Sequence, residues 1–483
     1  MAENISFYNT MSRKIEMLEP LDGQEIKMYC CGPTVYNYAH IGNLRTYIFE
    51  DILAKTIRLS GHKLKHVMNI TDVGHLTSDA DEGQDKMLLA AEREHTEVLK
   101  LARRYEKVFF DHTKALGLAR PDVVARATEH VQDMISFVKK LEEKGYAYFS
   151  NGNVYFDTSK FPEYGKLSKQ DRSGLKHGAR IEQDTNKRNP SDFVLWFTSS
   201  KFENQILQWD SPWGRGYPGW HIECSAMAMK YLGEHLDIHC GGIDHIPVHH
   251  ENEIAQSEAF LGHEWVHCWM HAEFLQVKDG KMSKSKGEFL TLDKLVEKGY
   301  KPEHYKYFCL MSHYKTPAAF SYDALDGAKN TYESLVDKID HLKNELNQKT
   351  THSDEEKSRE QLYIQKFNRY LFNDLRTPQA LAVMWDALRG DVLSVDSKLN
   401  FVKYIDQVFG LSLTERINER QEELIISDEI SKIIEERTLA RQDKNWKKSD
   451  ELRDVLTAKG IGIKDLSGNK YQLFSLKKKS IER

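Results

Sequence analysis

Hydrophobic residues in the first part of the chain form short runs separated by longer stretches with helical spacing. The runs at 26–31 and 64–70 predict two strands, and a helix is expected between them over about 40–53. A long helical stretch follows over about 85–118. Because strands and helices alternate in this order, the sequence predicts a parallel α/β sheet.

The segment 122–213 interrupts this alternation. A helix is expected over 123–143, followed by short strand-like pieces such as 153–157. We therefore expect an insertion between two halves of the sheet. A helix over 220–232 and a strand around 236–239 are predicted to resume the sheet.

The pattern beyond Tyr322 is helical. Apolar residues recur at spacings of three and four from Leu325 to Leu346, which predicts one long amphipathic helix. Helical segments are also expected over 359–389 and 396–409. These helices predict a bundle that follows the α/β part of the chain.

The last part of the chain has its own helical pattern. A charged segment near 413–423 is interpreted as a linker, and helices are expected over 428–442 and from Trp446 to about Lys459. Gly460 is placed where a helix would end, because glycine readily adopts the left-handed conformation found there. The sequence therefore predicts a separate C-terminal domain.

Composition restricts the class of protein. The 483 residues are 40% hydrophobic and 29% charged, which is typical of a soluble chain with several domains. The net charge of −5 means that any RNA-binding surface must be a local basic patch. Six cysteines are too few for a disulfide framework, and we find no signal peptide or membrane span. We expect a cytoplasmic protein without a membrane partner.

Two segments have the residue types that bind phosphate. His40, Gly42 and Asn43 lie where a strand turns into a helix, and backbone N–H groups at a helix start attract phosphate. His40 can donate to a phosphate oxygen, and Gly42 allows close approach of a nucleotide. Lys281 and Lys284 can neutralise developing charge on phosphates. An ordinary capped helix start and a solvated basic turn are the alternatives, and the presence of both segments favours a nucleotide site.

Four residues can form a metal site. His249 and Glu253 are four positions apart, so both project from one face of a helix. Cys224 lies just inside a predicted helix, and Cys31 lies at a strand end. Two thiolates, an imidazole and a carboxylate can complete a tetrahedral zinc shell. Core packing and polar networks are the alternative explanation for scattered cysteine and histidine residues.

The remaining cysteines and one histidine are assigned smaller roles. Cys30 and His250 are expected either to point to the opposite side of their elements or to support the ligands. Cys240, Cys268 and Cys309 are expected to be small buried hydrophobic residues.

Most of the chain resembles the cysteinyl-tRNA synthetase family of class I aminoacyl-tRNA synthetases. The matching segments are 31–36, 40–42, 69–72, 192–196, 211–214, 219–227, 237–239, 241–244, 249–256 and 281–285. In this family two cysteines, a histidine and a glutamate bind zinc, and they match Cys31, Cys224, His249 and Glu253.

The resemblance also implies the substrate-binding residues. The cysteine pocket would be formed by Gly32, Thr34, Thr71 and Trp220. The ATP site would be formed by His40, Gly42, Asn43, Gly241, Gly242, Asp244, Lys281, Met282, Ser283, Lys284 and Ser285. Among these, the resemblance assigns catalytic roles to His40, Gly42, Asn43, Lys281 and Lys284.

The fold implied by the resemblance is an α/β fold with a Rossmann-like parallel-sheet catalytic domain, an inserted connective subdomain, an α-helical bundle and a small anticodon-binding domain. The expected parts are the first half of the catalytic domain at 1–121, the connective insertion at 122–213, the second half at 214–265, a stem-contact region with the lysine segment at 266–321, the bundle at 322–412 and the C-terminal domain at 413–483.

The implied reaction has two steps. L-cysteine attacks the α-phosphate of ATP, bound with Mg²⁺, and gives cysteinyl-adenylate; the terminal ribose of tRNA(Cys) then accepts the cysteinyl group. One Zn²⁺ per chain would bind the thiolate of cysteine and reject the hydroxyl of serine. We expect a monomer.

The resemblance extends to an anticodon-binding region over 440–454. Lys444, Lys447, Lys448 and Arg453 would contact phosphates of tRNA, and a base could stack on Trp446. The alternative is an amphipathic helix with Trp446 packed inside.

Three segments depart from the family pattern. Asn43 stands where the family usually has histidine, and the segments 73–83 and 245–248 are divergent. A cysteine ligase that acts on an amino sugar, as in the mycothiol pathway, is an alternative function, although such an acceptor needs neither the bundle nor the C-terminal domain. A non-catalytic protein, a zinc- and nucleotide-binding RNA chaperone or regulator, is a second alternative, which the two complete phosphate-binding segments disfavour.

Overall fold

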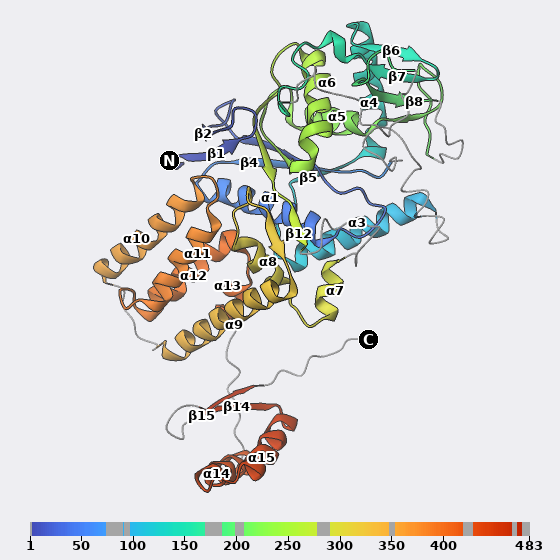
Figure 1. Ribbon diagram of the computed structural model, residues 1–483. Coiled ribbons are helices and arrows are strands. Elements are labelled where there is room, and N and C mark those ends of the chain that lie inside the picture. The colour runs from blue at the N-terminus through green and yellow to red at the C-terminus, as the bar shows by residue number, and fades with distance from the viewer. Residues whose placement is uncertain are drawn as a thin grey trace. The chain divides into compact units, whose positions relative to one another are not determined.

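The computed structural model describes residues 2–73, 90, 97–169, 186–198, 207–277, 290–346, 353–418, 428–465 and 471–475 (Figure 1). The chain divides into two compact units, residues 1–417 and 418–483, and each unit is described by itself. In the described residues, no helix combines the length and apolar character that a membrane crossing requires.

The first unit is built on a five-stranded parallel sheet with the strand order β11-β10-β3-β4-β5. These strands are β3 (Ile26–Cys30), β4 (Leu64–Ile70), β5 (Val123–Arg126), β10 (Leu236–Gly242) and β11 (Val266–Ala272). Every residue of β10 is buried, as expected for a strand covered on both faces. The α/β class with a parallel sheet, predicted from the sequence, is confirmed.

Helices connect these strands. They are α1 (Ile41–Leu59), α3 (Val98–Ala115), α4 (Val131–Glu143), α5 (Trp220–Leu232) and α6 (Glu251–Leu261). Strand β3 has β4, the next strand of this sheet along the chain, as its neighbour on one side. Strand β10 is its neighbour on the other side. The carboxyl ends of β3 and β10 therefore meet where the strand order reverses, the usual position of a ligand site in such sheets.

One predicted helix was wrong in its first part. The sequence predicted a helix over 123–143, but Val123–Arg126 is strand β5 and α4 begins only at Val131. The four residues are too few to show a strand period of their own, and pairing with β4 determines their conformation. An antiparallel hairpin of β1 (Ile5–Asn9) and β2 (Lys14–Leu18) was not predicted from the sequence.

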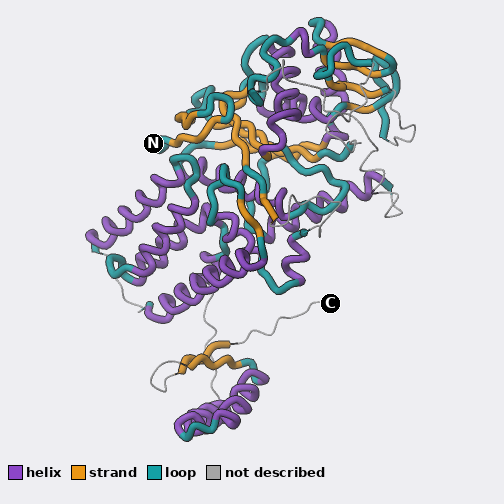
Figure 2. The backbone as a smooth tube through the Cα atoms, viewed as in Figure 1, coloured by secondary structure: helices purple, strands orange, loops and turns teal. Residues whose placement is uncertain are grey.

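A second sheet is antiparallel and has the order β6-β7-β8-β9 (Figure 2). Its strands are β6 (Ala147–Ser150), β7 (Asn153–Phe156), β8 (Phe193–Phe197) and β9 (Tyr217–Pro218). β9 leads directly into α5, because Gly219 is the residue before that helix. Short strand pieces after 143 were predicted, and β7 is one of them.

The later part of the first unit is mainly helical. It contains α7 (Leu292–Glu297), α8 (Pro302–Leu310), α9 (Tyr322–Glu345), α10 (Asp354–Leu371), α11 (Thr377–Arg389), α12 (Val395–Phe409) and α13 (Leu413–Asn418, its last residue in the second unit), together with the paired strands β12 (Leu275–Val277) and β13 (Ala318–Phe320). The helical region predicted beyond Tyr322 is present, and α13 lies in the segment that was interpreted as a linker.

The second unit consists of two helices and a hairpin. They are α14 (Asp428–Gln442), α15 (Trp446–Ala458), β14 (Ile461–Asp465) and β15 (Tyr471–Ser475). Gly460 follows Lys459, the residue that caps the end of α15, and has a φ of 80°, as predicted for the end of that helix.

Candidate active site

The site begins at the amino end of α1. His40 precedes the helix, and the backbone N–H of Asn43 donates to Nδ1 of His40 at 3.0 Å. A Cβ atom at Gly42 would lie 2.9 Å from a ring carbon of His40, so glycine leaves the space that the imidazole occupies. His40 therefore caps the helix, and its ring stays at the helix start.

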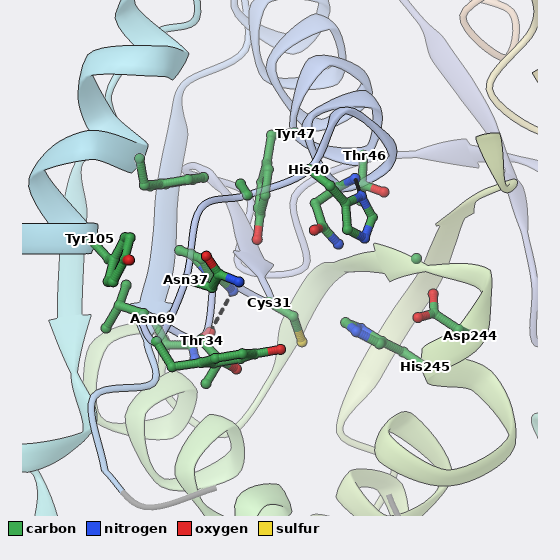
Figure 3. A pocket seen from close by; sticks show the side chains of 18 of the residues that line it. Cys31, Thr34, Asn37, His40, Thr46, Tyr47, Asn69, Tyr105, Asp244 and His245 are labelled. Atoms are coloured by element: carbon green, nitrogen blue, oxygen red, sulfur yellow. Dashed lines mark hydrogen bonds between the residues drawn. The ribbon is translucent and has the colours of Figure 1, made fainter. Parts of the chain in front are cut away.

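A cavity of about 280 Å³ opens between this helix start and the carboxyl ends of β3 and β10 (Figure 3). The predicted site residues that line it are Cys31, Gly32, Thr34, His40, Asn43, Trp220, Cys224, Gly242, Asp244 and His249. Gly42, Gly241, Thr71 and Glu253 are adjacent in the chain or in space but do not line it. Lys281, Met282, Ser283, Lys284 and Ser285 lie outside the described residues.

Four potential metal ligands meet beside this cavity, and three of them, Cys31, Cys224 and His249, line it. One ligand atom each of Cys31, Cys224, His249 and Glu253 lies within 4.8 Å of the others. The two sulfur atoms are 4.0 Å apart, and His249 Nε2 is 2.8 Å from a carboxylate oxygen of Glu253. Tetrahedral zinc with Zn–S bonds of about 2.3 Å holds two sulfurs about 3.8 Å apart, so the donor set fits zinc in kind and in spacing.

The charges of this cluster suit a cation. Burial would raise the pKa of Cys224, but a hydrogen bond from Cys31 and the charge of His249 lower it to about 6. Burial would also raise the pKa of Glu253, yet the charges of His239 and His249 hold it below the usual range. These shifts favour the anionic forms of Cys224 and Glu253, whereas burial raises the pKa of Cys31, so a divalent ion would have to displace the proton of that thiol.

Two of the histidines around these ligands, His239 and His221, had no role assigned from the sequence. His239 Nε2 lies 2.9 Å from the second carboxylate oxygen of Glu253, and His221 Nδ1 lies 2.9 Å from His249 Nδ1. His250 Nε2 is 3.4 Å from the sulfur of Cys31. His250 thus lies on the same side as the ligands and not on the opposite side. Of the two roles expected for it, support of the ligands is the one that fits.

A second group of possible ligands overlaps the first. Cys31, His239, His250 and Glu253 also have ligand atoms within 4.8 Å of one another. Spacing in the sequence could not reveal His239, because it comes from β10 and meets Glu253 only across the fold. The adjacent pair of His249 and His250 was the signal that could have suggested more than one histidine near the ligands.

The proposed cysteine-pocket residues are held by a buried polar network. The backbone N–H of Gly32 donates to the side-chain oxygen of Asn69 at 2.8 Å, and a Cβ at Gly32 would collide with the carbonyl oxygen of that residue. Thr71 donates to the buried carboxyl group of Glu223 at 2.8 Å. Thr71 therefore lies behind the residues that line the cavity. Trp220, which lines it, stacks on His249 with ring centroids 4.1 Å apart.

The start of α1 is also tied to the residues on both sides of the undescribed segment 278–289. The Ile41 N–H donates to the carbonyl oxygen of Leu290 at 2.9 Å, and His40 forms a β-bridge with Thr291. On the other side, Arg45 donates to the carbonyl oxygens of Glu273 and Phe274. The two ends of the segment that contains the lysines thus lie against the helix that contains His40.

In the second unit, most of the predicted RNA-binding residues are exposed, and one of them is bonded to an aspartate. Trp446 is 56% exposed, so the alternative with this ring packed inside is wrong. Lys444, Lys447 and Lys448 are exposed on and just before α15. Arg453, in contrast, donates to the carboxylate of Asp465 at 2.7 Å.

Comparison with known proteins identifies the relatives of the chain. Residues 17–330 match a family model described as the catalytic domain of class I (C) tRNA synthetases. The chain is 46% identical over 484 residues to a cysteine--tRNA ligase of Treponema denticola, with 96% of this chain and 98% of the relative covered. It is 42% identical over 470 residues to a cysteine--tRNA ligase of Borreliella burgdorferi, with 95% and 98% covered.

A solved structure shows the same fold. The methionyl-tRNA synthetase of Mycobacterium tuberculosis, in complex with methionyl-adenylate, matches with a TM-score of 0.60 and 14% identity, and the match covers 82% of this chain and 93% of that chain. At this identity the likeness concerns the fold alone.

Proposed function

The chain belongs to the class I (C) tRNA synthetase family, in which its relatives are cysteine--tRNA ligases, and we propose that it attaches L-cysteine to tRNA(Cys) with consumption of ATP. The observation that carries the proposal is one cavity lined by two chemically different groups of residues. Cys31, Cys224 and His249 form one group, and His40 and Asn43 form the other.

The reaction begins with the attack of the cysteine carboxylate on the α-phosphate of ATP. The side chain of His40 and the backbone N–H groups at the start of α1 stabilise the charge that develops on the phosphate. Asn43 replaces a second imidazole there, and its side-chain amide can also donate to a phosphate oxygen. The products are cysteinyl-adenylate and pyrophosphate, and Mg²⁺ accompanies ATP as part of the substrate.

The lysine segment contributes to the same step in our proposal. Lys281 and Lys284 stabilise the leaving pyrophosphate, and Met282, Ser283 and Ser285 complete their loop. Support comes from the described flanking residues, since Leu290 and Thr291 contact the helix start that contains His40. Gly241, Gly242 and Asp244 form the adenosine side, and Asp244 lies on the cavity wall.

Selection of cysteine depends on the potential metal ligands. Cys31, Cys224, His249 and Glu253 would hold one zinc ion, which would bind the thiolate of cysteine and leave the poorly acidic hydroxyl of serine unbound. Gly32, Thr34, Thr71 and Trp220 shape the pocket around the amino acid. A dedicated polar contact of this kind discriminates by about 10⁴–10⁵, so the site needs no editing reaction.

Transfer to RNA completes the proposed function. The terminal ribose of tRNA(Cys) attacks the carbonyl carbon of cysteinyl-adenylate and releases AMP. Lys444, Lys447 and Lys448 on the second unit supply positive charge for RNA phosphates, and the exposed Trp446 supplies a ring for base stacking.

The test is charging of total tRNA with labelled cysteine or labelled serine, with zinc measured on the same sample. We expect charging with cysteine alone and about one zinc per chain. Cysteine-dependent release of pyrophosphate without charging would indicate a different acceptor, such as an amino sugar. Release of no pyrophosphate with any amino acid would refute the enzyme function.

A further inference from the structure

The hairpin of β1 and β2 is bonded to strand β11. The side chain of Asn9 accepts a hydrogen bond from the Trp269 N–H at 3.1 Å and donates to the carbonyl oxygen of His267 at 2.8 Å. The N–H of Thr10, the residue after β1, donates to the carbonyl oxygen of Trp269 at 2.7 Å. Thr10 is therefore held next to the part of β11 that contains His271.

A series of hydrogen bonds leads from this hairpin to a potential metal ligand. Thr10 Oγ1 lies 2.8 Å from His271 Nδ1, and His271 Nε2 lies 2.8 Å from His250 Nδ1. His250 Nε2 lies 3.4 Å from the sulfur of Cys31. All four residues are buried, and both nitrogens of each imidazole have a partner. The series therefore connects Thr10 to Cys31 through two rings that are bonded at both ends.

The pairing of β10 with β11 makes room for these rings. Gly241 on β10 is the register partner of His271 on β11. A Cβ atom at Gly241 would lie 2.8 Å from a ring carbon of His250, so a side chain there would displace this imidazole. The ring of Trp269 packs against His250 with centroids 5.0 Å apart. These contacts keep the ring of His250 between β11 and Cys31.

The chemistry of a thiolate determines the direction of these hydrogen bonds. A cysteine that binds a metal ion is deprotonated, so its sulfur accepts hydrogen bonds and donates none. His250 Nε2 then carries the proton, and in a neutral ring Nδ1 is an acceptor that needs a donor. Burial lowers the pKa of His271 well below its usual value, so this ring is neutral and has one N–H, which Nδ1 of His250 accepts. The other nitrogen of His271 accepts the hydroxyl of Thr10.

Resting on the zinc site of the function proposed above, we propose that Thr10 and His271 are positioning residues, which hold His250 so that its Nε2–H donates to the sulfur of Cys31. A hydrogen bond of this kind draws electron density from a thiolate, and partners of metal ligands tune the metal in this way. Cys31 would then donate less density to a bound zinc ion, which leaves the ion a stronger acceptor for the thiolate of cysteine. The series deepens the selection of cysteine, because it links the hairpin to the affinity for the substrate thiol.

Cobalt(II) in place of zinc makes this hydrogen bond measurable, because the thiolate-to-cobalt charge-transfer absorption reports the electron density on the sulfurs. The full-length wild type, His271→Phe and Thr10→Val are loaded with Co²⁺. Phenylalanine keeps a ring without a donor, and valine keeps the shape of threonine without the hydroxyl. We expect the charge-transfer band to move to longer wavelength in both variants, and further in His271→Phe, because a sulfur without its N–H donor gives up charge more easily.

Two further variants separate this role from a general loss of packing. Thr10→Ser keeps the hydroxyl, and we expect the charge-transfer band at the wild-type position. Thr56→Val is the matched control, since Thr56 is a buried threonine of α1 whose hydroxyl has no hydrogen-bond partner in the part of the chain that the structure describes. It should also give the wild-type band.

Cysteine-dependent ATP–pyrophosphate exchange by the zinc-bound proteins is the second readout. We expect His271→Phe to raise the KM for cysteine roughly ten- to hundredfold, as for other partners of metal ligands, while the KM for ATP stays unchanged. Thr10→Val should raise the KM for cysteine by a smaller factor, and Thr10→Ser should leave it at the wild-type value.

A charge-transfer band at the wild-type position in both His271→Phe and Thr10→Val, each with a full complement of cobalt, would overturn the positioning role. An equal shift in Thr10→Ser and Thr10→Val would also overturn it. Where His271→Phe does not fold, the two variants of Thr10 decide alone. A wild type that binds neither Co²⁺ nor Zn²⁺ would refute the zinc site itself, and this inference with it. A wild type that binds the ion without charging tRNA would refute the proposed function and leave the spectral comparison valid.

Discussion

The sulfur atoms of Cys31 and Cys224 lie 4.0 Å apart, although 193 positions separate the two residues in the chain. Cys31 follows strand β3, and Cys224 lies in the first turns of α5. The parallel sheet and its covering helices bring the two thiols to one place. The pair therefore depends on the whole first unit of the fold rather than on any local motif.

Substitution of Cys224 tests the metal site. We expect Cys224→Ala to purify with less than about a tenth of the wild-type zinc, because the ion loses one of its two thiolate ligands from the chain. Cysteine-dependent pyrophosphate exchange should fall by about 100-fold or more. The control is Cys309→Ala, since Cys309 is a buried thiol outside the cluster. Unchanged exchange in Cys224→Ala would rule out the proposed site.

The contact between His239 and Glu253 predicts that substitution of His239 lowers the zinc affinity less than substitution of the ligand Cys224. His239 Nε2 lies 2.9 Å from the carboxylate oxygen that does not face His249, so it can orient Glu253 as a ligand. We expect His239→Gln to weaken zinc binding roughly 10–100-fold, as for other partners of metal ligands. Competition with a chelator measures this affinity, and His235→Gln on the surface is the control. Equal affinities of the two variants would contradict the orienting role.

Helices and strands whose apolar pattern is bounded by turn residues at both ends could be predicted from the sequence. The helix expected over 220–232 is α5 with the same bounds, because Gly219 and Gly233 flank a continuous apolar and helical pattern. The strands expected at 26–31 and 64–70 are β3 and β4, since their apolar runs are isolated by turn residues. In these elements, local propensity and the global fold agree.

Features that arise from long-range pairing could not be predicted. Strand β5 has only four residues, and its register with β4 exists only in the folded sheet. The assembly of histidines around Glu253 has the same origin, because His239 comes from a strand and His250 from the turn before α6. Spacing in a sequence reveals neighbours on one helix, and it does not reveal neighbours across a sheet.

Arg45 is expected to connect α1 to the segments that flank β12 and β13. Its buried guanidinium donates to the backbone carbonyls of Glu273, Phe274, His313 and Thr316. We expect Arg45→Met to lower the free energy of unfolding by roughly 3 kcal/mol, because buried carbonyl groups lose their donor. Urea denaturation measures this change.

Arg58→Met is the matched control on the same helix. Arg58 pairs with Asp122 at 2.9 Å, and both side chains are more than a third exposed. A pair of this kind contributes about 0–1 kcal/mol. Similar losses of stability in the two variants would show that the carbonyl contacts of Arg45 have no special importance.

Lys306 predicts a pH dependence of stability. The residue is fully buried, its Nζ donates to the carbonyls of Gly117 and Gly410, and burial lowers its pKa from 10.5 to about 8 despite the nearby Asp51. Between pH 8 and 10.5 the unfolded chain holds this proton and the folded chain does not. The contribution of Lys306 to the free energy of unfolding should therefore rise by about 3 kcal/mol across this window.

The measurement is urea denaturation at intervals from pH 7 to pH 10.5 for the wild type and for Lys306→Met. Other groups titrate in both proteins, so the difference between the two curves isolates Lys306. We expect this difference to change in favour of the wild type as pH rises. A constant difference would show that the buried ammonium group keeps its ordinary pKa.

Two basic residues of α15 are expected to have different roles. Arg453 has a structural role, and Lys447 contacts RNA. Asp465 accepts hydrogen bonds from Arg437, Arg441 and Arg453, and the charges of these arginines, Arg437 first, lower its pKa. Lys447 is exposed on α15. We expect Lys447→Gln to weaken tRNA binding and to reduce the slope of log affinity against log salt by about 1, because one phosphate contact is lost.

Arg453→Gln should behave differently, since its guanidinium is engaged by Asp465 within the second unit. We expect faster amide hydrogen exchange in α15 and an unchanged salt slope, because a lost internal ion pair loosens the helix without removing a phosphate contact. If Arg453→Gln instead reduced the slope as Lys447→Gln does, with unchanged exchange, Arg453 would have to leave Asp465 and contact the RNA directly.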